Sequence, residues 1–97
     1  MITSKERSIL NSIATNVNTT IYLGKNGVTE AFLAQVDEML EDHELLKIGV
    51  QKNCEYTAKE VIDALCHALD ADPVHAIGSK IIIYRKSSKE GVKHLLQ

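Results

Sequence analysis

The chain has 97 residues, of which 44% are hydrophobic and 25% are charged, and its formal net charge is −2. A chain of this size is long enough for one compact core and too short for two. No stretch approaches the roughly 18 apolar residues of a membrane span, and the first residues carry no signal-peptide hydrophobic run. We therefore expect a single cytoplasmic domain that does not associate with membranes. Taken as a total, the net charge counts against nucleic-acid binding.

The charge is unevenly distributed along the chain. Residues 30–72 contain eleven carboxylates and three lysines, a local charge of −8. The remaining residues contain eight Lys or Arg and two Glu, a charge of +6. An acidic stretch of this kind is typical of solvated helix faces. The basic segments flank it on both sides, and they matter for an anionic partner if the fold brings them together.

Capping signals and apolar spacing divide the chain into seven elements. Thr3-x-x-Glu6 and Thr57-x-x-Glu60 are capping boxes that open helices, and Pro73 prevents continuation of the third helix. The first predicted helix covers about 3–17, with an apolar stripe from Ile9 to Val17, and a strand over 20–23 follows it. After a turn over 24–27, we predict a second helix from 28–29 to about 42 and a half-buried strand over 45–50 with Lys47 pointing outward. The third helix covers about 57–69, and the last two elements are hairpin strands over 74–77 and 80–86.

The order α-β-α-β-α-β-β defines the predicted fold class. Two right-handed βαβ crossovers place the second and third helices on the same face of the sheet. The segment 81–84 is apolar on both faces, which favours an interior strand, so the closing hairpin inserts its antiparallel strand between the second and third strands. We expect a two-layer α/β sandwich with a mixed four-stranded sheet. Its core covers about residues 3–87, and a polar, frayed or loosely docked tail follows over 88–97.

The turn Gly24-Lys25-Asn26-Gly27 lies between a strand and a helix. Glycines let a backbone turn tightly and approach a ligand, and helix N-terminal amides together with Lys25 favour an anion such as a sugar-phosphate backbone. The alternative is a plain strand-to-helix turn. The sequence does not match the common nucleotide-binding loops.

A scattered set of cations is the second candidate for binding phosphates: Lys5, Arg7, Lys25, Lys47, Lys80, Arg85 and Lys86. Tyr22 or Tyr84 could offer a stacking surface to unpaired bases. For each cation taken singly, a role in solubility is the simpler interpretation. The stretch containing Glu38, Glu41, Asp42 and Glu44 is interpreted as carboxylates on polar helix faces.

The sequence gives little support to catalysis. The four histidines are scattered without metal-ligand spacing, and Cys66 falls in the apolar stripe of the third helix. Two cysteines twelve residues apart form neither a disulfide framework nor a zinc signature. We expect no enzymatic activity, no metal, no cofactor and no small-molecule substrate.

Four motifs occur here in one order along about residues 3–87: Ser4-Lys5-x-Arg7, the run from Tyr22 to Thr29, Gln51-x-Asn53-Cys54, and Ile77-Gly78 leading to Ile83-Tyr84-Arg85. Together they resemble the YhbY-type or CRM (chloroplast RNA splicing and ribosome maturation) family of RNA-binding proteins. The resemblance implies a domain similar to the C-terminal domain of translation initiation factor three. It also implies RNA contact by the GxxG loop, residues Gly24, Lys25, Asn26 and Gly27, and by the cations Lys5, Arg7 and Arg85.

The leading hypothesis is an RNA-binding protein of large-subunit ribosome assembly. Its partners would be ribosomal RNA and the precursor particle, reached through the GxxG loop and the basic residues around it, Lys47 and Lys80 included. One alternative is a protein-interaction module whose acidic second and third helices dock a basic ribosomal protein. Another is a DNA-binding role.

Overall fold

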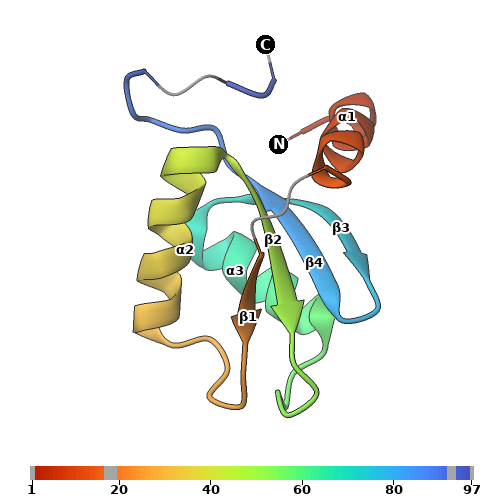
Figure 1. The fold of residues 1–97 in the computed structure, drawn as a ribbon, viewed down its shortest axis with the longest axis vertical. Helices are drawn as coiled ribbons and strands as arrows, with labels where there is room; N and C mark the ends of the chain where they lie inside the picture. Colours follow the sequence, from red (N-terminus) through yellow and green to blue (C-terminus); the bar gives the residue numbers. More distant parts are fainter. Residues whose placement is uncertain (1, 17–19, 92–93, 97) are drawn as a thin grey trace.

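Within residues 2–16, 20–91 and 94–96, which the computed structural model describes, the elements follow the predicted order (Figure 1). They are α1 (Ser4–Ala14), β1 (Thr20–Leu23), α2 (Glu30–His43), β2 (Leu45–Val50), α3 (Ala58–Leu69), β3 (Asp72–Ile77) and β4 (Lys80–Tyr84). The predicted place of Val17 in the first apolar stripe lies outside the described residues. None of the described helices is long and apolar enough to span a membrane.

Both predicted capping boxes are present. The Thr3 hydroxyl accepts from the Glu6 amide at 3.1 Å while the Glu6 carboxylate accepts from the Thr3 amide at 2.9 Å. Thr57 and Glu60 repeat this exchange at the start of α3, and these hydrogen bonds hold the pKa of Glu60 below its usual value. Each pair satisfies amides that the first helical turn leaves without partners.

The sheet order is β1-β2-β4-β3. β1 is parallel to β2, whereas β4 is antiparallel to both of its neighbours. The insertion of β4 between β2 and β3 confirms the prediction. Ile81, Ile82 and Ile83 are all buried, as expected for an interior strand.

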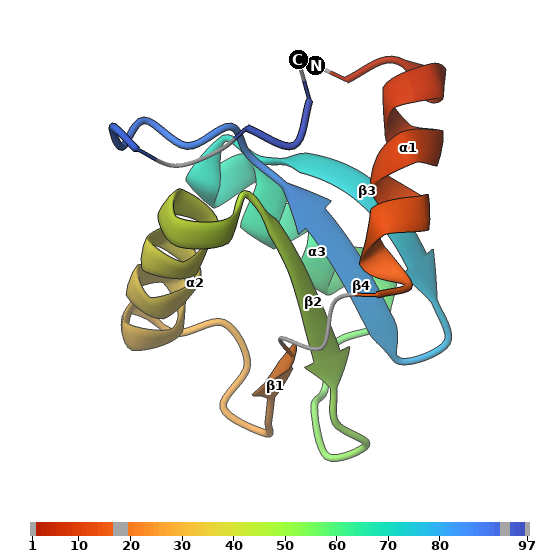
Figure 2. The ribbon, with the colours of Figure 1, turned by 45° about the horizontal axis from the view of Figure 1, so that its top comes forward.

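Helices α2 and α3 cover one face of the sheet, and the predicted α/β sandwich is confirmed (Figures 1 and 2). Their buried residues Leu40 and Leu65 belong to one cluster with Ile48, Ile81 and Ile83. Burial of this apolar surface is the main stabilising contribution to the fold.

Helix α1, which the sequence did not place, packs on the opposite face. Leu10 and Ala14 form a second cluster with apolar residues of three strands: Leu45, Val74, Ile82 and Tyr84. The prediction of a half-buried β2 is therefore wrong, because α1 covers Leu45 on the second face. Ile9 was expected in the buried stripe but is 43% exposed, since α1 contacts the sheet through Leu10 and Ala14 instead.

Three chain connections meet at one end of the sheet. Leu23 pairs with Val50 at the ends of β1 and β2, and Gly49 pairs with Lys80 at the start of β4. The Val50 amide also donates to the Ser79 carbonyl at 2.6 Å. The β1–α2 loop, the β2–α3 loop and the β3–β4 turn are thus neighbours, and we call this region the loop end (Figure 1).

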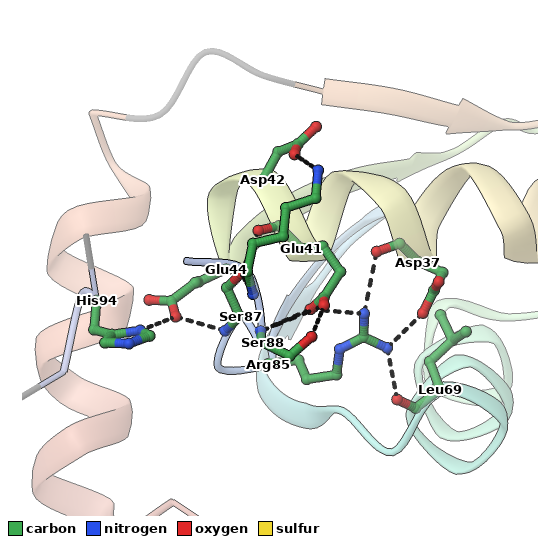
Figure 3. Close-up of polar contacts among 10 residues, drawn as sticks. Asp37, Glu41, Asp42, Glu44, Leu69, Arg85, Ser87, Ser88 and His94 are labelled. Atoms are coloured by element: carbon green, nitrogen blue, oxygen red, sulfur yellow. Dashed lines mark hydrogen bonds and ion pairs between the residues drawn. The ribbon is translucent and has the colours of Figure 1, made fainter. Parts of the chain in front are cut away.

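At the opposite end of the sheet, described residues of the C-terminal segment dock on Glu44, which agrees with the second of the two arrangements expected for the tail. Ser87 is buried, and its amide donates to the Glu44 carboxylate at 2.6 Å. The Leu95 amide donates to the other oxygen of Glu44 at 2.8 Å. His94 Nδ1 lies 2.6 Å from Oε2 (Figure 3).

The prediction that Glu44 lies on a polar face is also wrong, because its side chain is fully buried. Burial by itself raises the pKa of this carboxyl. Hydrogen bonds from His94, Ser87 and Leu95 outweigh that effect and hold the pKa below its usual value. Glu44 therefore serves as a charged anchor between the end of α2 and the C-terminal segment.

Candidate nucleic-acid interface

The GxxG loop is a tight turn at the loop end. The Gly27 amide donates to the Gly24 carbonyl at 3.1 Å, which leaves Lys25 and Asn26 exposed at the tip. Gly27 has φ of 66°, a backbone conformation that residues with a Cβ rarely adopt. The backbone conformation at position 27 therefore favours the second glycine of the GxxG loop.

The second loop, residues 51–56, packs directly against the first. The Gln51 amide donates to the Leu23 carbonyl at 2.9 Å. A Cβ at Gly24 would lie 3.2 Å from Gln51 Oε1, and one at Gly27 would lie 3.0 Å from the Tyr56 ring. Both glycines thus permit a close approach between the two loops, which fixes the position of Lys25.

A pocket of about 310 Å³ separates the GxxG loop from the first turns of α3. It is lined by Asn26, Val28, Tyr56, Glu60, Val61 and Ala64. The Glu60 carboxylate is already engaged by Thr57 and disfavours a second anion there. This pocket is therefore less suited to an anion than the lysine side of the loop.

Exposed lysines from all three connections gather at the loop end: Lys25 in the first loop, Lys52 in the second and Lys80 after the hairpin turn. The segments 24–29, 51–57 and 78–80 contain one carboxylate, Glu55, so their net charge is +2. Half-buried Lys47 lies further along β2. The loop end is therefore a positive region on an acidic protein.

Lys52 and Tyr56 were not among the predicted site residues. Sequence reasoning grouped Lys52 with the acidic middle and gave no role to Tyr56, which is 51% exposed and packs on Gly27. The predicted topology could have indicated both residues, because the carboxyl ends of two parallel strands meet at the same edge of a sheet. Loops that follow β1 and β2 must then be neighbours.

The structure does not bring the α1 cations to the loop end. Lys5 and Arg7 are exposed on the first turns of α1, which begins at the far end of the molecule (Figure 2). Arg7 instead lines a shallow depression beside β3, together with Lys59 and His75. Any contact of these cations with RNA would form a footprint separate from the GxxG loop.

Arg85 also lies away from the loop end, and its guanidinium is held by protein groups (Figure 3). Nη1 lies 2.7 Å from the Asp37 carboxylate and donates to the Leu69 carbonyl at 3.0 Å. Nη2 donates to the Asp37 carbonyl at 3.1 Å and lies 3.4 Å from Glu41. The side chain ties α2 to the end of α3 and is not positioned beside the GxxG loop.

We expect Arg85→Ala to destabilise the fold without weakening RNA binding. Two hydrogen bonds to the carbonyls of Leu69 and Asp37 are lost, which lowers the free energy of unfolding by about 1–2 kcal/mol. Urea denaturation measures this change, with exposed Lys86→Ala as the control. Weaker RNA binding by the folded Arg85→Ala protein at unchanged stability would contradict the structural role.

The two tyrosines considered as stacking surfaces differ in exposure. Tyr84 is 5% exposed within the α1 cluster, and burial, followed by the charges of Glu44, Glu6 and Asp72, raises its pKa. It is therefore a core residue and cannot stack on a base. Tyr22 is 62% exposed and remains available.

The cysteine and histidine side chains show no organised site. Burial, reinforced by Asp72 and Asp63, raises the pKa of the Cys66 thiol to about 11, which keeps it protonated and unreactive at neutral pH. In the described part of the chain, no group of three or more His, Cys, Asp or Glu residues could hold a metal ion.

The structure thus defines a small α/β domain with a GxxG loop at a lysine-bearing sheet end. Residues 2–85 match the CRS1/YhbY (CRM) domain family. Because this match spans most of the chain, the protein belongs to that family.

Similar proteins support the assignment. The chain is 34% identical over 89 residues to Probable RNA-binding protein YqeI of Bacillus subtilis, covering 92% of this chain and 93% of that protein. It is 30% identical over 92 residues to an RNA-binding protein of Haemophilus influenzae, covering 95% and 93%. The solution structure of the hypothetical protein SAV1595 from Staphylococcus aureus superposes with a TM-score of 0.77 at 35% identity, covering 97% of this chain and 99% of that one.

Proposed function

We propose that this protein binds RNA through its loop end. The observation that carries the proposal is the convergence of Lys25, Lys52 and Lys80 from three separate connections around the GxxG loop. Lysines spaced along a surface bind phosphates without reading base sequence. The names of the relatives from B. subtilis and H. influenzae, both called RNA-binding, support the same conclusion.

The charge distribution sets the character of this binding. The positive loop end lies on a protein of net charge −2, so the rest of the surface repels a polyanion. Binding is therefore modest in affinity, restricted to one side and strongly weakened by salt.

We further propose that the RNA is ribosomal RNA of the large subunit, contacted in the cytoplasm during assembly of the precursor particle. The resemblance of the four ordered motifs to the YhbY-type family supports this part of the proposal. Crosslinking in cells followed by sequencing of the attached RNA tests it. Recovery dominated by large-subunit ribosomal RNA is the expected result, and recovery of RNA in proportion to its abundance would reduce the function to general polyanion binding.

The loop end itself is tested by Lys25→Glu. We expect about a 10-fold loss of affinity for structured ribosomal RNA fragments and a shallower dependence of log K on log salt, by about 0.7–0.9 per lost phosphate contact. Lys86→Glu makes the same charge change on an exposed residue after the far end of β4 and serves as the matched control. Equal binding by the two variants would reject the loop assignment.

The alternative, docking of a basic protein on the acidic helices, receives less support from the structure. Asp37 and Glu41 share an ion pair with Arg85, and Asp42 pairs with Lys89 at 2.5 Å. Much of the negative charge at the end of α2 is therefore satisfied within the chain. Charge reversal at exposed Glu38, combined with assays of ribosome association and of naked-RNA binding, separates this alternative from RNA binding.

A further inference from the structure

Tyr22 has an unusual position for an exposed aromatic residue. It lies on β1 directly beside Gly49 of β2, and a Cβ at Gly49 would lie 2.7 Å from its ring. The Cδ1–Cε1 edge of the ring thus occupies the space where a side chain at position 49 would otherwise lie. Tyr22 nevertheless remains 62% exposed, so the part of the ring away from Gly49 is accessible to a ligand.

The exposed part of the Tyr22 ring lies on the sheet surface that carries α1, not on the α2–α3 side. Ile21 and Leu23, its neighbours in sequence, pack into the α2–α3 cluster, and side chains alternate along a strand. Helix α1 packs on the same surface further along, at Leu45 and Tyr84. The structure therefore presents a rigid aromatic ring on a part of the sheet near the loop end.

Positive charge lies in the same row of the sheet. Gly49 pairs with Tyr22 on one side and with Lys80 on the other, so Tyr22 and Lys80 flank it on a common face. Their backbones are two strand spacings apart, about 10 Å. This separation suits a nucleotide whose base contacts the ring while a neighbouring phosphate reaches the Lys80 ammonium.

A structural role accounts for the contact between the ring and Gly49, since an aromatic side chain beside a glycine restores the packing that the glycine lacks. This structural role does not require the rest of the Tyr22 ring to remain exposed in the same row of the sheet as Lys80. An aromatic ring fixed by its neighbours loses little conformational entropy when a base stacks on it. Such stacking is available to unpaired bases, whose faces are free, and not to bases inside a duplex.

We infer that Tyr22 is a stacking platform for an unpaired base, and that the ligand class of the loop end is RNA with single-stranded nucleotides. The inference rests on the proposed RNA-binding function and adds its ligand class. Phosphates contact the lysines of the loop end, and the base lies on the exposed part of the Tyr22 ring, which is close to Gly49.

The experiment compares a single-stranded RNA of about 10 nucleotides with the duplex that it forms with its complement. Tyr22→Ala is expected to weaken single-strand binding about 10-fold, to leave duplex binding unchanged and to leave the salt dependence unchanged. Tyr22→Phe is expected to bind like the natural protein because it keeps the ring. Ile77→Ala removes a comparably exposed apolar side chain from the same sheet and is the matched control.

A second readout does not depend on the stability of Tyr22→Ala. The chain contains no tryptophan, so Tyr22→Trp introduces a single fluorophore at this position. The single strand is expected to quench its fluorescence and the duplex is not.

The outcomes separate this inference from the proposed function. Equal loss of single-strand and duplex binding in Tyr22→Ala, or no quenching on single-strand binding, would overturn the stacking role. If Lys25→Glu weakens binding while Tyr22→Ala does not, the proposed function survives and the platform is rejected. If the natural protein binds neither RNA, both fail.

Discussion

Replacement of Glu44 by alanine is expected to lower the free energy of unfolding by about 3 kcal/mol. The fully buried carboxylate accepts hydrogen bonds from the amides of Ser87 and Leu95 and contacts the His94 ring. Without it, two amides lose their partners at a site where water cannot easily replace them. Chemical denaturation monitored by circular dichroism measures the loss, which corresponds to a fall in Tm of roughly 12–24 °C.

The neighbouring Asp42→Ala is the matched control. Asp42 is exposed and pairs with Lys89 at the surface, so its removal is expected to change stability little. If both variants unfold at the same denaturant concentration as the natural protein, the anchoring role of Glu44 is wrong.

The stabilisation by Glu44 depends on pH in a defined direction. Its pKa is lower in the folded protein than the usual value of 4.5, so the contribution is fully present above pH 4.5. It is lost as the pH falls from 4.5 through the lower folded value, because the folded state must then accept a proton that the unfolded chain binds more readily. Stability measured against Glu44→Gln, which does not titrate, isolates this effect.

Reversal of all three loop-end lysines is expected to reduce RNA affinity by at least about 100-fold at moderate salt. The triple variant Lys25→Glu, Lys52→Glu, Lys80→Glu changes the charge of the three connections from +2 to −4. The three substitutions remove the proposed phosphate contacts and add electrostatic repulsion between the new carboxylates and the RNA phosphates. The lysine side chains are exposed, so the fold is expected to remain intact, which circular dichroism checks.

A control with the same change in net charge makes this test specific. The triple variant Lys5→Glu, Arg7→Glu, Lys86→Glu alters exposed cations outside the loop end. The RNA affinity of this control variant is expected to fall much less, because only the overall electrostatic repulsion between protein and RNA increases. Comparable losses in the two triple variants would show that RNA responds to net charge and not to the loop end.

The features predicted correctly from the sequence are those with local causes. The capping boxes at Thr3 and Thr57 depend on residues three positions apart. The insertion of β4 follows from a segment that is apolar on both faces and therefore needs neighbours on both sides. The predicted tight turn at residues 24–27 is present, and Gly27 has a positive φ there.

The errors arise from contacts between distant residues. Glu44 is indistinguishable in sequence from the carboxylates around it, and its burial depends on partners 43 to 51 residues later. Arg85 looks like a solvated cation at a strand end, yet its partners lie 16 to 48 residues away. Nothing in either local sequence specifies these contacts.

The candidate site was predicted only in part for the same reason. The GxxG loop is contiguous and carries its own signal, whereas Lys52 and Tyr56 join it through strand pairing. Lys5 and Arg7 lie apart from the loop because α1 begins at the far end of the molecule (Figure 2). Which cations lie close together depends on the topology of the sheet, and a count of charges along the sequence does not reveal that topology.

The anchor at Glu44 also sets the order in which the protein can be completed during synthesis. A nascent chain that has just extended past α2 already contains this carboxylate, but the amides of Ser87 and Leu95 are added 43 and 51 residues later. At translation rates of about 5–20 residues per second, the delay is about 2 to 10 seconds. Until then the charge must stay hydrated, so these contacts at the junction between α2 and β2 form only after Ser87 and Leu95 have been added.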